Sequence, residues 1–109
     1  MEGKARVHEQ ESEERRLRSR QAWKRAKRLA NERDHYLCAL CLAEGVLNWE
    51  NLETHHIVPL KDDPGLAYDV DNLVTLCRRH HEIAEGYPPG VLREKIEAGR
   101  NPRQTSEDN

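Results

Sequence analysis

Three cysteines and one histidine form two pairs with the same short spacing. Two residues separate Cys38 from Cys41 and Cys77 from His80, and 35 residues lie between the pairs. Two such pairs, each on one side of a tight turn, complete the tetrahedral ligand shell that zinc prefers. Three thiols would leave one unpaired in a disulfide framework. The alternative is that the cysteines are buried as small apolar side chains, but the repeated spacing favours a closed structural zinc site.

The other paired histidines could perform a different chemistry. His55 and His56 are adjacent, and His81 follows His80. If Cys77 and His80 share one face of a helix, His81 lies about 100° further round and points elsewhere. We expect it to face the strand that carries His55 and His56. Because successive side chains of a strand point to opposite sides, one of these two can bind an ion while the other takes up a proton.

The motifs around these histidines resemble those of one nuclease family. They are Thr54-His55-His56-Ile57-Val58-Pro59-Leu60, Asp71-Asn72-Leu73 and Leu76-Cys77-Arg78-Arg79-His80-His81-Glu82, preceded by the first cysteine pair. Together they resemble the HNH endonucleases, in particular small phage-type members with a structural zinc, over residues 22–86. The resemblance implies that His55 and His81 bind a catalytic ion and that His56 is the general base.

The resemblance also implies a reaction. A water activated by His56 would attack the scissile phosphate in line and leave a 5′-phosphate and a 3′-hydroxyl. The catalytic ion would be Mn²⁺, Ni²⁺, Co²⁺, Mg²⁺ or Zn²⁺, and since imidazole suits the transition metals, these should serve at least as well as magnesium. Asn72 either braces the loop that aims the base or contributes to the metal site. Its alternative is an ordinary Asp-Asn turn.

A small α+β framework must position these residues. The apolar and β-branched character of residues 52–57 and 73–76 predicts two antiparallel strands, and the polar run 78–85 predicts a helix. The two ligand pairs are expected to form a zinc knuckle from residues 36–41 and 77–80. Together with this knuckle, the two strands and the helix predict a ββα-metal (His-Me finger) core over residues 52–86. The expected segment at 36–41 is short and extended, followed by a loop.

A basic helix is expected to precede this core. Strong helix formers without glycine or proline predict a helix over residues 15–32. Its apolar stripe would comprise Trp23, Ala26, Leu29 and Ala30. Residues 1–34 hold 11 basic and 7 acidic side chains, whereas the rest of the chain holds 7 and 13. Although the net charge of the chain is −2, the positive charge is therefore concentrated in residues 1–34, where it can attract phosphate groups.

DNA is the expected partner of this field. The candidate DNA-binding residues are Arg20, Lys24, Arg25, Lys27, Arg28, Arg78 and Arg79. Arg78, Arg79 and Lys61 are the candidates for phosphate contacts near the catalytic histidines. Because such contacts position a duplex without reading bases, we expect weak sequence preference and a steep dependence of binding on salt.

The domain boundaries follow from these elements. Residues 1–14 are expected to be disordered or a frayed helical segment, residues 15–98 to form the nuclease domain with a short closing helix at 90–98, and residues 99–109 to be a disordered tail. With 36% hydrophobic residues and no phenylalanine, the core is thin, so a structural metal should help to hold it. No apolar run is long enough to span a membrane, and no signal peptide is recognisable.

The sequence therefore predicts a cytoplasmic, monomeric, metal-dependent DNA endonuclease or nickase. The resemblance adds a phage origin, a link to genome packaging, and the terminase and other packaging proteins as partners. Two alternatives remain: a zinc-knuckle DNA-binding module without cleavage, and a defence or toxin nuclease with the same chemistry. A binding module would gain nothing from His55, His56 and His81.

Overall fold

The computed structural model describes the backbone of residues 2–100 and the side chains of residues 13–100. The elements are α1 (Glu2–Arg33), α2 (Ala39–Ala43), β1 (Leu52–His56), the 3-10 turns η1 (Pro64–Leu66) and η2 (Val70–Asn72), β2 (Leu73–Cys77), α3 (Arg78–Ala84) and α4 (Pro89–Arg100). The predicted α+β class and the ββα arrangement of β1, β2 and α3 are confirmed.

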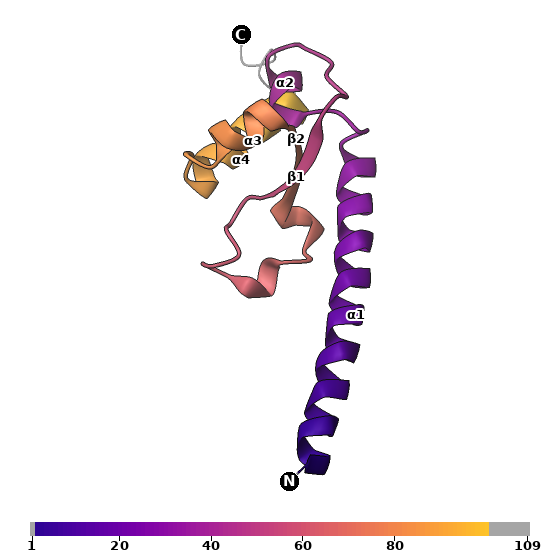
Figure 1. Ribbon diagram of the computed structural model, residues 1–109. Coiled ribbons are helices and arrows are strands. Elements are labelled where there is room, and N and C mark those ends of the chain that lie inside the picture. The colour runs from indigo at the N-terminus through magenta and orange to yellow at the C-terminus, as the bar shows by residue number, and fades with distance from the viewer. Residues whose placement is uncertain (1, 101–109) are drawn as a thin grey trace.

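The two strands form an antiparallel hairpin that separates two sets of side chains. The register pairs Leu52 with Cys77 and His56 with Leu73. Because side chains alternate along a strand, His55 and His56 point to opposite faces. The His55 ring meets His81 of α3, and the His56 ring meets α1. Figure 1 shows α1 along one side of the hairpin and α3 with α4 on the other.

Helix α1 is longer than expected and extends well beyond the hairpin (Figure 1). It begins at Glu2 and so includes residues 2–14, for which disorder or a frayed helix was predicted. The segment from residue 4 to the helix end contains neither glycine nor proline, and Arg18 pairs with Glu14 one turn away, at 3.4 Å.

The apolar stripe of α1 differs from the prediction at one position. Ala26 and Ala30 are buried against Leu73, with Trp23 packed beside them, as the spacing indicated. The prediction was wrong for Leu29, whose surface is 38% exposed. The small alanines allow the helix to lie close to β2, and the bulkier leucine is rotated away from that contact.

A buried carboxylate, Asp34, joins the end of α1 to the rest of the fold. Its oxygens accept hydrogen bonds from the Thr75 amide at 2.9 Å, from Arg33 at 2.8 and 3.1 Å, and from Arg100 at 2.8 Å. Burial acts to raise the pKa of Asp34, but the hydrogen bonds and the two guanidinium charges outweigh it and lower the pKa. Arg33 also donates to the Leu73 carbonyl at 2.6 Å. It is therefore a structural residue rather than part of the basic surface.

The knuckle segment is helical where an extended segment was expected. Residues 36–41 do not continue as a strand, because α2 begins directly after Cys38. The Cys38 sulfur accepts a hydrogen bond from the Cys41 amide at 3.4 Å and caps the helix. A side-chain acceptor at this position favours a helical turn. The prediction for this segment was wrong, and the loop that it placed from residue 42 begins after α2.

The larger core cluster surrounds the cysteines. It consists of Cys38, Ala39, Leu40, Cys41, Ile57, Val74, Leu76, Cys77, Ala84, Leu92 and Ile96. The last two come from α4, which is longer than the closing helix expected at residues 90–98 and includes residues 99 and 100 of the predicted tail. The rest of that tail, residues 101–109, lies outside the described residues. Across residues 2–100, no helix is long and apolar enough to cross a membrane.

Candidate functional site

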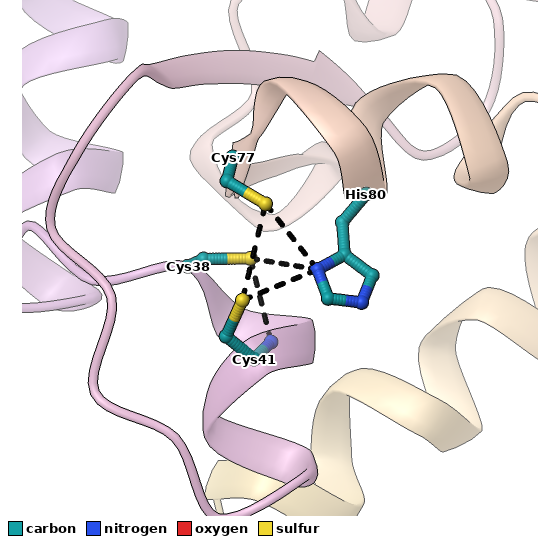
Figure 2. A group of neighbouring side chains, drawn as sticks. All are labelled: Cys38, Cys41, Cys77 and His80. Carbon is teal, nitrogen blue, oxygen red and sulfur yellow. Dashed lines mark hydrogen bonds between the residues drawn. The ribbon is translucent and has the colours of Figure 1, made fainter.

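Three elements bring the knuckle residues into one buried cluster. Cys38 and Cys41 come from the start of α2, Cys77 from the end of β2 and His80 from α3 (Figure 2). The Nδ1 atom of His80 lies 3.4 Å from the Cys38 sulfur, 3.3 Å from that of Cys41 and 3.4 Å from that of Cys77. The sulfurs of Cys41 and Cys77 are 3.9 Å apart.

These distances fit a tetrahedral zinc ion. Bond lengths of about 2.3 Å to sulfur and about 2.0 to 2.1 Å to nitrogen give edges of about 3.8 Å between sulfurs and about 3.5 Å between sulfur and nitrogen. The four ligand atoms lie within 4.8 Å of one another. Among the described residues, no other group of three or more histidine, cysteine or acidic side chains is gathered in this way.

The electrostatics of the cluster also suit a cation. Burial raises the pKa of Cys38 to about 12, so a thiolate there requires a positive charge beside it. Burial has the same tendency at Cys77, but hydrogen bonds from the His80 backbone and side chain outweigh it and lower the pKa to about 7. Zinc binds the thiolate form. The Cys₃His donor set therefore fits a structural zinc.

Two residues that the sequence analysis missed support this cluster. The Glu44 carboxylate lies 3.0 Å from Nε2 of His80, the ring atom that points away from the sulfurs. The Asn48 amide donates to the Cys41 sulfur at 3.6 Å. Such outer partners orient metal ligands. Both residues lie within ten residues of Cys41, but nothing in the local pattern indicates that their side chains turn back toward it.

The second histidine group lines a separate cavity of about 500 Å³. The rings of His55 and His81 contact each other edge to face in its wall, with centroids 4.8 Å apart and planes at 77°. Lys61 and Glu85 also line this cavity. Burial and the neighbouring His81 lower the pKa of His55 to about 4. The ring is therefore neutral near physiological pH, the state in which imidazole binds a metal ion.

Two carboxylates that the sequence analysis did not single out contact His81. Glu53 lies 2.5 Å from its Nδ1 atom, and Glu85 lies 3.9 Å from its Nε2 atom. A carboxylate that accepts a hydrogen bond from one ring nitrogen of a histidine orients the other nitrogen toward a metal. The distance between the Glu85 carboxylate oxygen and Nε2 of His81 is short enough for these two atoms to bind one ion. Glu53 precedes His55 by two residues on the same strand face, and Glu85 follows His81 by one helical turn.

His56 is held on the opposite face of the hairpin. Its ring stacks on Trp23, with centroids 5.2 Å apart and planes 17° from parallel. Its Nε2 atom lies 3.0 Å from the Ala67 carbonyl oxygen. Since a carbonyl can only accept, Nε2 carries a hydrogen, and in the neutral ring the lone pair is therefore on Nδ1. Trp23 therefore packs against the cluster of Ala26, Ala30 and Leu73, as expected, and it also stacks on the ring of His56, the predicted general base.

Asn72 is buried and braces the chain that follows β1. Its side-chain oxygen accepts from the Val58 amide at 2.8 Å, and its side-chain nitrogen donates to the carbonyls of Val58 at 3.1 Å and Leu66 at 3.4 Å. Val58 lies two residues after His56. These contacts correspond to the first of the two roles considered for Asn72, the bracing of the loop, and leave its amide engaged with backbone.

The predicted DNA-binding residues fall into four places. Arg20 lines a groove that reaches His56, and Arg25 lines a neighbouring hollow. Arg78 and Arg79 instead line a cavity beside Cys41 and Cys77. They were expected near the catalytic histidines, but they lie at the start of α3, whereas His81 faces β1 one turn later. The remaining residues, Lys24, Lys27 and Arg28, are exposed on α1.

Comparison with known proteins agrees with this geometry. The model of the HNH endonuclease family matches residues 38–84. Over these residues the chain is similar to the HNH endonucleases, and the Cys₃His cluster is compatible with a zinc-binding domain of this type. The match begins at the first zinc-knuckle cysteine and ends with α3, so it includes both histidine pairs and Asn72. Neither the curated proteins nor the solved structures yielded a match to the chain.

Proposed function

We propose that this protein is a metal-dependent DNA endonuclease of the HNH type that hydrolyses phosphodiester bonds to 5′-phosphate and 3′-hydroxyl ends. The single observation that carries the proposal is the second histidine group. His55, His56 and His81 line one cavity, apart from the sulfur cluster. A module that only bound DNA would need the knuckle and no second set of imidazoles.

The contacts of these side chains support a different role for each of them. His55 and His81 would hold the catalytic divalent cation, with Glu53 orienting His81 through Nδ1. The bound cation would supply charge neutralisation at the scissile phosphate and at the leaving 3′ oxygen. His56, with Nε2 donating to the Ala67 carbonyl, would accept the proton of the attacking water at Nδ1.

The rest of the site would position the phosphate. Lys61 lies in the wall of the catalytic cavity, and the orphaned hydroxyl of Thr54, buried in the same wall, lacks a hydrogen-bond partner among the described residues. A phosphate oxygen could satisfy this hydroxyl. Asn72 would act as a positioning residue, because it holds Val58 and thus the turn that follows the base.

One hydrolytic centre per chain would cut one strand, so the expected product of a monomer is a nick. The resemblance to small phage enzymes extends the proposal to a phage-encoded nickase in genome packaging, with the terminase as partner and the host cytoplasm as its location. A defence nuclease would use the same residues, and the genes beside this one distinguish the two roles.

Supercoiled plasmid tests the chemistry. Zinc-loaded protein with manganese or nickel should convert it to the open circular form, and His56→Ala should slow this by about 10²- to 10⁴-fold, the usual contribution of a general base. Phosphatase treatment followed by end-labelling identifies the 5′-phosphate. Intact plasmid with every divalent ion tried, from protein that still binds DNA, would favour the binding module instead.

A further inference from the structure

A second hollow lies directly beside the predicted base. It has a volume of about 590 Å³ and is lined by residues of α1 and of the chain between the two strands. His56 and Leu60 line both this groove and the catalytic cavity. The two hollows therefore meet at His56, so a DNA strand whose phosphate lies beside that ring would continue into the groove.

The groove combines apolar surface with positive charge. Tyr68 and Leu60 contribute side chains that are 44% and 46% exposed, and Trp23 contributes the ring that supports His56. Arg15, Arg16 and Arg20 line the same groove, and its lining contains no acidic residue.

This combination is the chemistry that binds a single nucleotide. Ring faces stack on bases of any identity, while guanidinium groups pair with the adjoining phosphates. Arg16, Arg20 and Trp23 follow one another at spacings of four and three residues, so they share one side of α1. Lys24, Lys27 and Arg28 lie outside the groove.

We propose that this groove binds an unpaired nucleotide next to the scissile phosphate, with its base stacked on Tyr68. The inference rests on the proposed nuclease function and names its substrate class. In an intact duplex both faces of a base are covered by its neighbours, so its ring is available to Tyr68 only where the base is unstacked. The protein therefore prefers DNA with an unpaired base beside the cut, such as a gap, bulge or flap, over a fully paired duplex.

Binding and stacking can be measured without cleavage. The protein carries one equivalent of zinc and no other divalent ion, and the probes are a fully paired duplex and the same duplex with one unpaired 2-aminopurine. Fluorescence anisotropy should show at least about tenfold tighter binding of the unpaired probe, and 2-aminopurine emission should fall on binding as the base stacks.

Variants assign the effect to the groove. Tyr68→Ala should abolish the fall in emission and most of the preference while leaving affinity for the paired duplex within about twofold, whereas Tyr68→Phe should retain both. Trp49→Ala is the control, because Trp49 is also an exposed aromatic residue, at 65% against 44% for Tyr68, and it lies in the loop between α2 and β1 and does not line the groove. Zinc content and circular dichroism confirm that each variant is folded.

The outcomes separate this inference from the nuclease function. Equal affinity for both probes, or an equal loss for both in Tyr68→Ala, overturns the groove as a base-binding site even if plasmid is nicked. A retained preference in a protein that never nicks plasmid would refute the nuclease and leave the nucleotide site standing.

Discussion

Gly99 marks the place where α4 crosses α2 at the closest approach. A Cβ atom added there would lie 2.9 Å from the Ala39 carbonyl oxygen, 2.9 Å from the Ala43 nitrogen and 3.1 Å from the Ala43 Cα. All three atoms belong to backbone, so no side-chain rotation can relieve the overlap. Gly99→Ala must therefore push the two helices apart.

Two opposing effects decide how much Gly99→Ala changes the free energy of unfolding. Alanine is favoured over glycine by about 0.8 to 1.0 kcal/mol in a helix interior, and by less than this at Gly99, the penultimate residue of α4. Overpacking of a close contact costs about 1 to 3 kcal/mol, and a contact with backbone belongs in the upper part of that range. We therefore expect Gly99→Ala to lower the free energy of unfolding by about 1 to 2 kcal/mol, or the melting temperature by about 5 to 10 °C.

Gly90→Ala in the same helix is the matched control. No atom lies within 4 Å of a Cβ at Gly90, so this variant should be as stable as the wild type or slightly more stable. Urea unfolding at one fixed excess of zinc measures both, since bound zinc itself adds to stability. Because Cys41 lies on α2, Gly99→Ala should also weaken zinc binding in a chelator competition. If Gly99→Ala matched Gly90→Ala in both measurements, the close approach of α2 and α4 would be refuted.

Other expectations concern the buried polar groups and the paired histidines. Because the folded pKa of Asp34 lies below its ordinary value of 3.8, its stabilisation is complete above that pH and is lost as the pH falls through the folded pKa. Asp34→Asn should lower the free energy of unfolding by about 2 kcal/mol at neutral pH, less than the loss of a fully buried ion pair, because its arginine partners are partly exposed. The variant should also lose less stability than the wild type as the pH falls below 3.8, and an equal loss in both proteins would contradict this. Asn72→Ala should cost about 1 to 3 kcal/mol in urea unfolding, since the partly buried amide of Val58 loses its acceptor, and should slow plasmid nicking at least about tenfold; unchanged nicking would show that the brace does not aim the base. His80→Ala should lose zinc and stability, whereas His81→Ala should keep zinc and fail to cut, as zinc content and nicking would show; the reverse pattern would exchange their roles.

Local spacing was sufficient for much of the framework. The two ligand pairs of the knuckle, the antiparallel strands and the helix that follows them could be read from the sequence, because turns and side-chain alternation act over a few residues. The same reasoning placed His81 away from His80. It was less successful for α2, since the helix depends on the Cys38 sulfur acting as a cap.

The tertiary structure alone decided how distant segments complete the site. The Ala67 carbonyl selects the ring nitrogen of His56 that stays free, and Glu53 reaches His81 across 28 positions of sequence. Arg78 lies beside the knuckle although it is close to His81 in the chain. The sequence by itself determined which residue types could bind metal and move a proton. Their partners depended on which faces of α1, α3 and the hairpin pack together, and burial of those faces is a property of the whole fold.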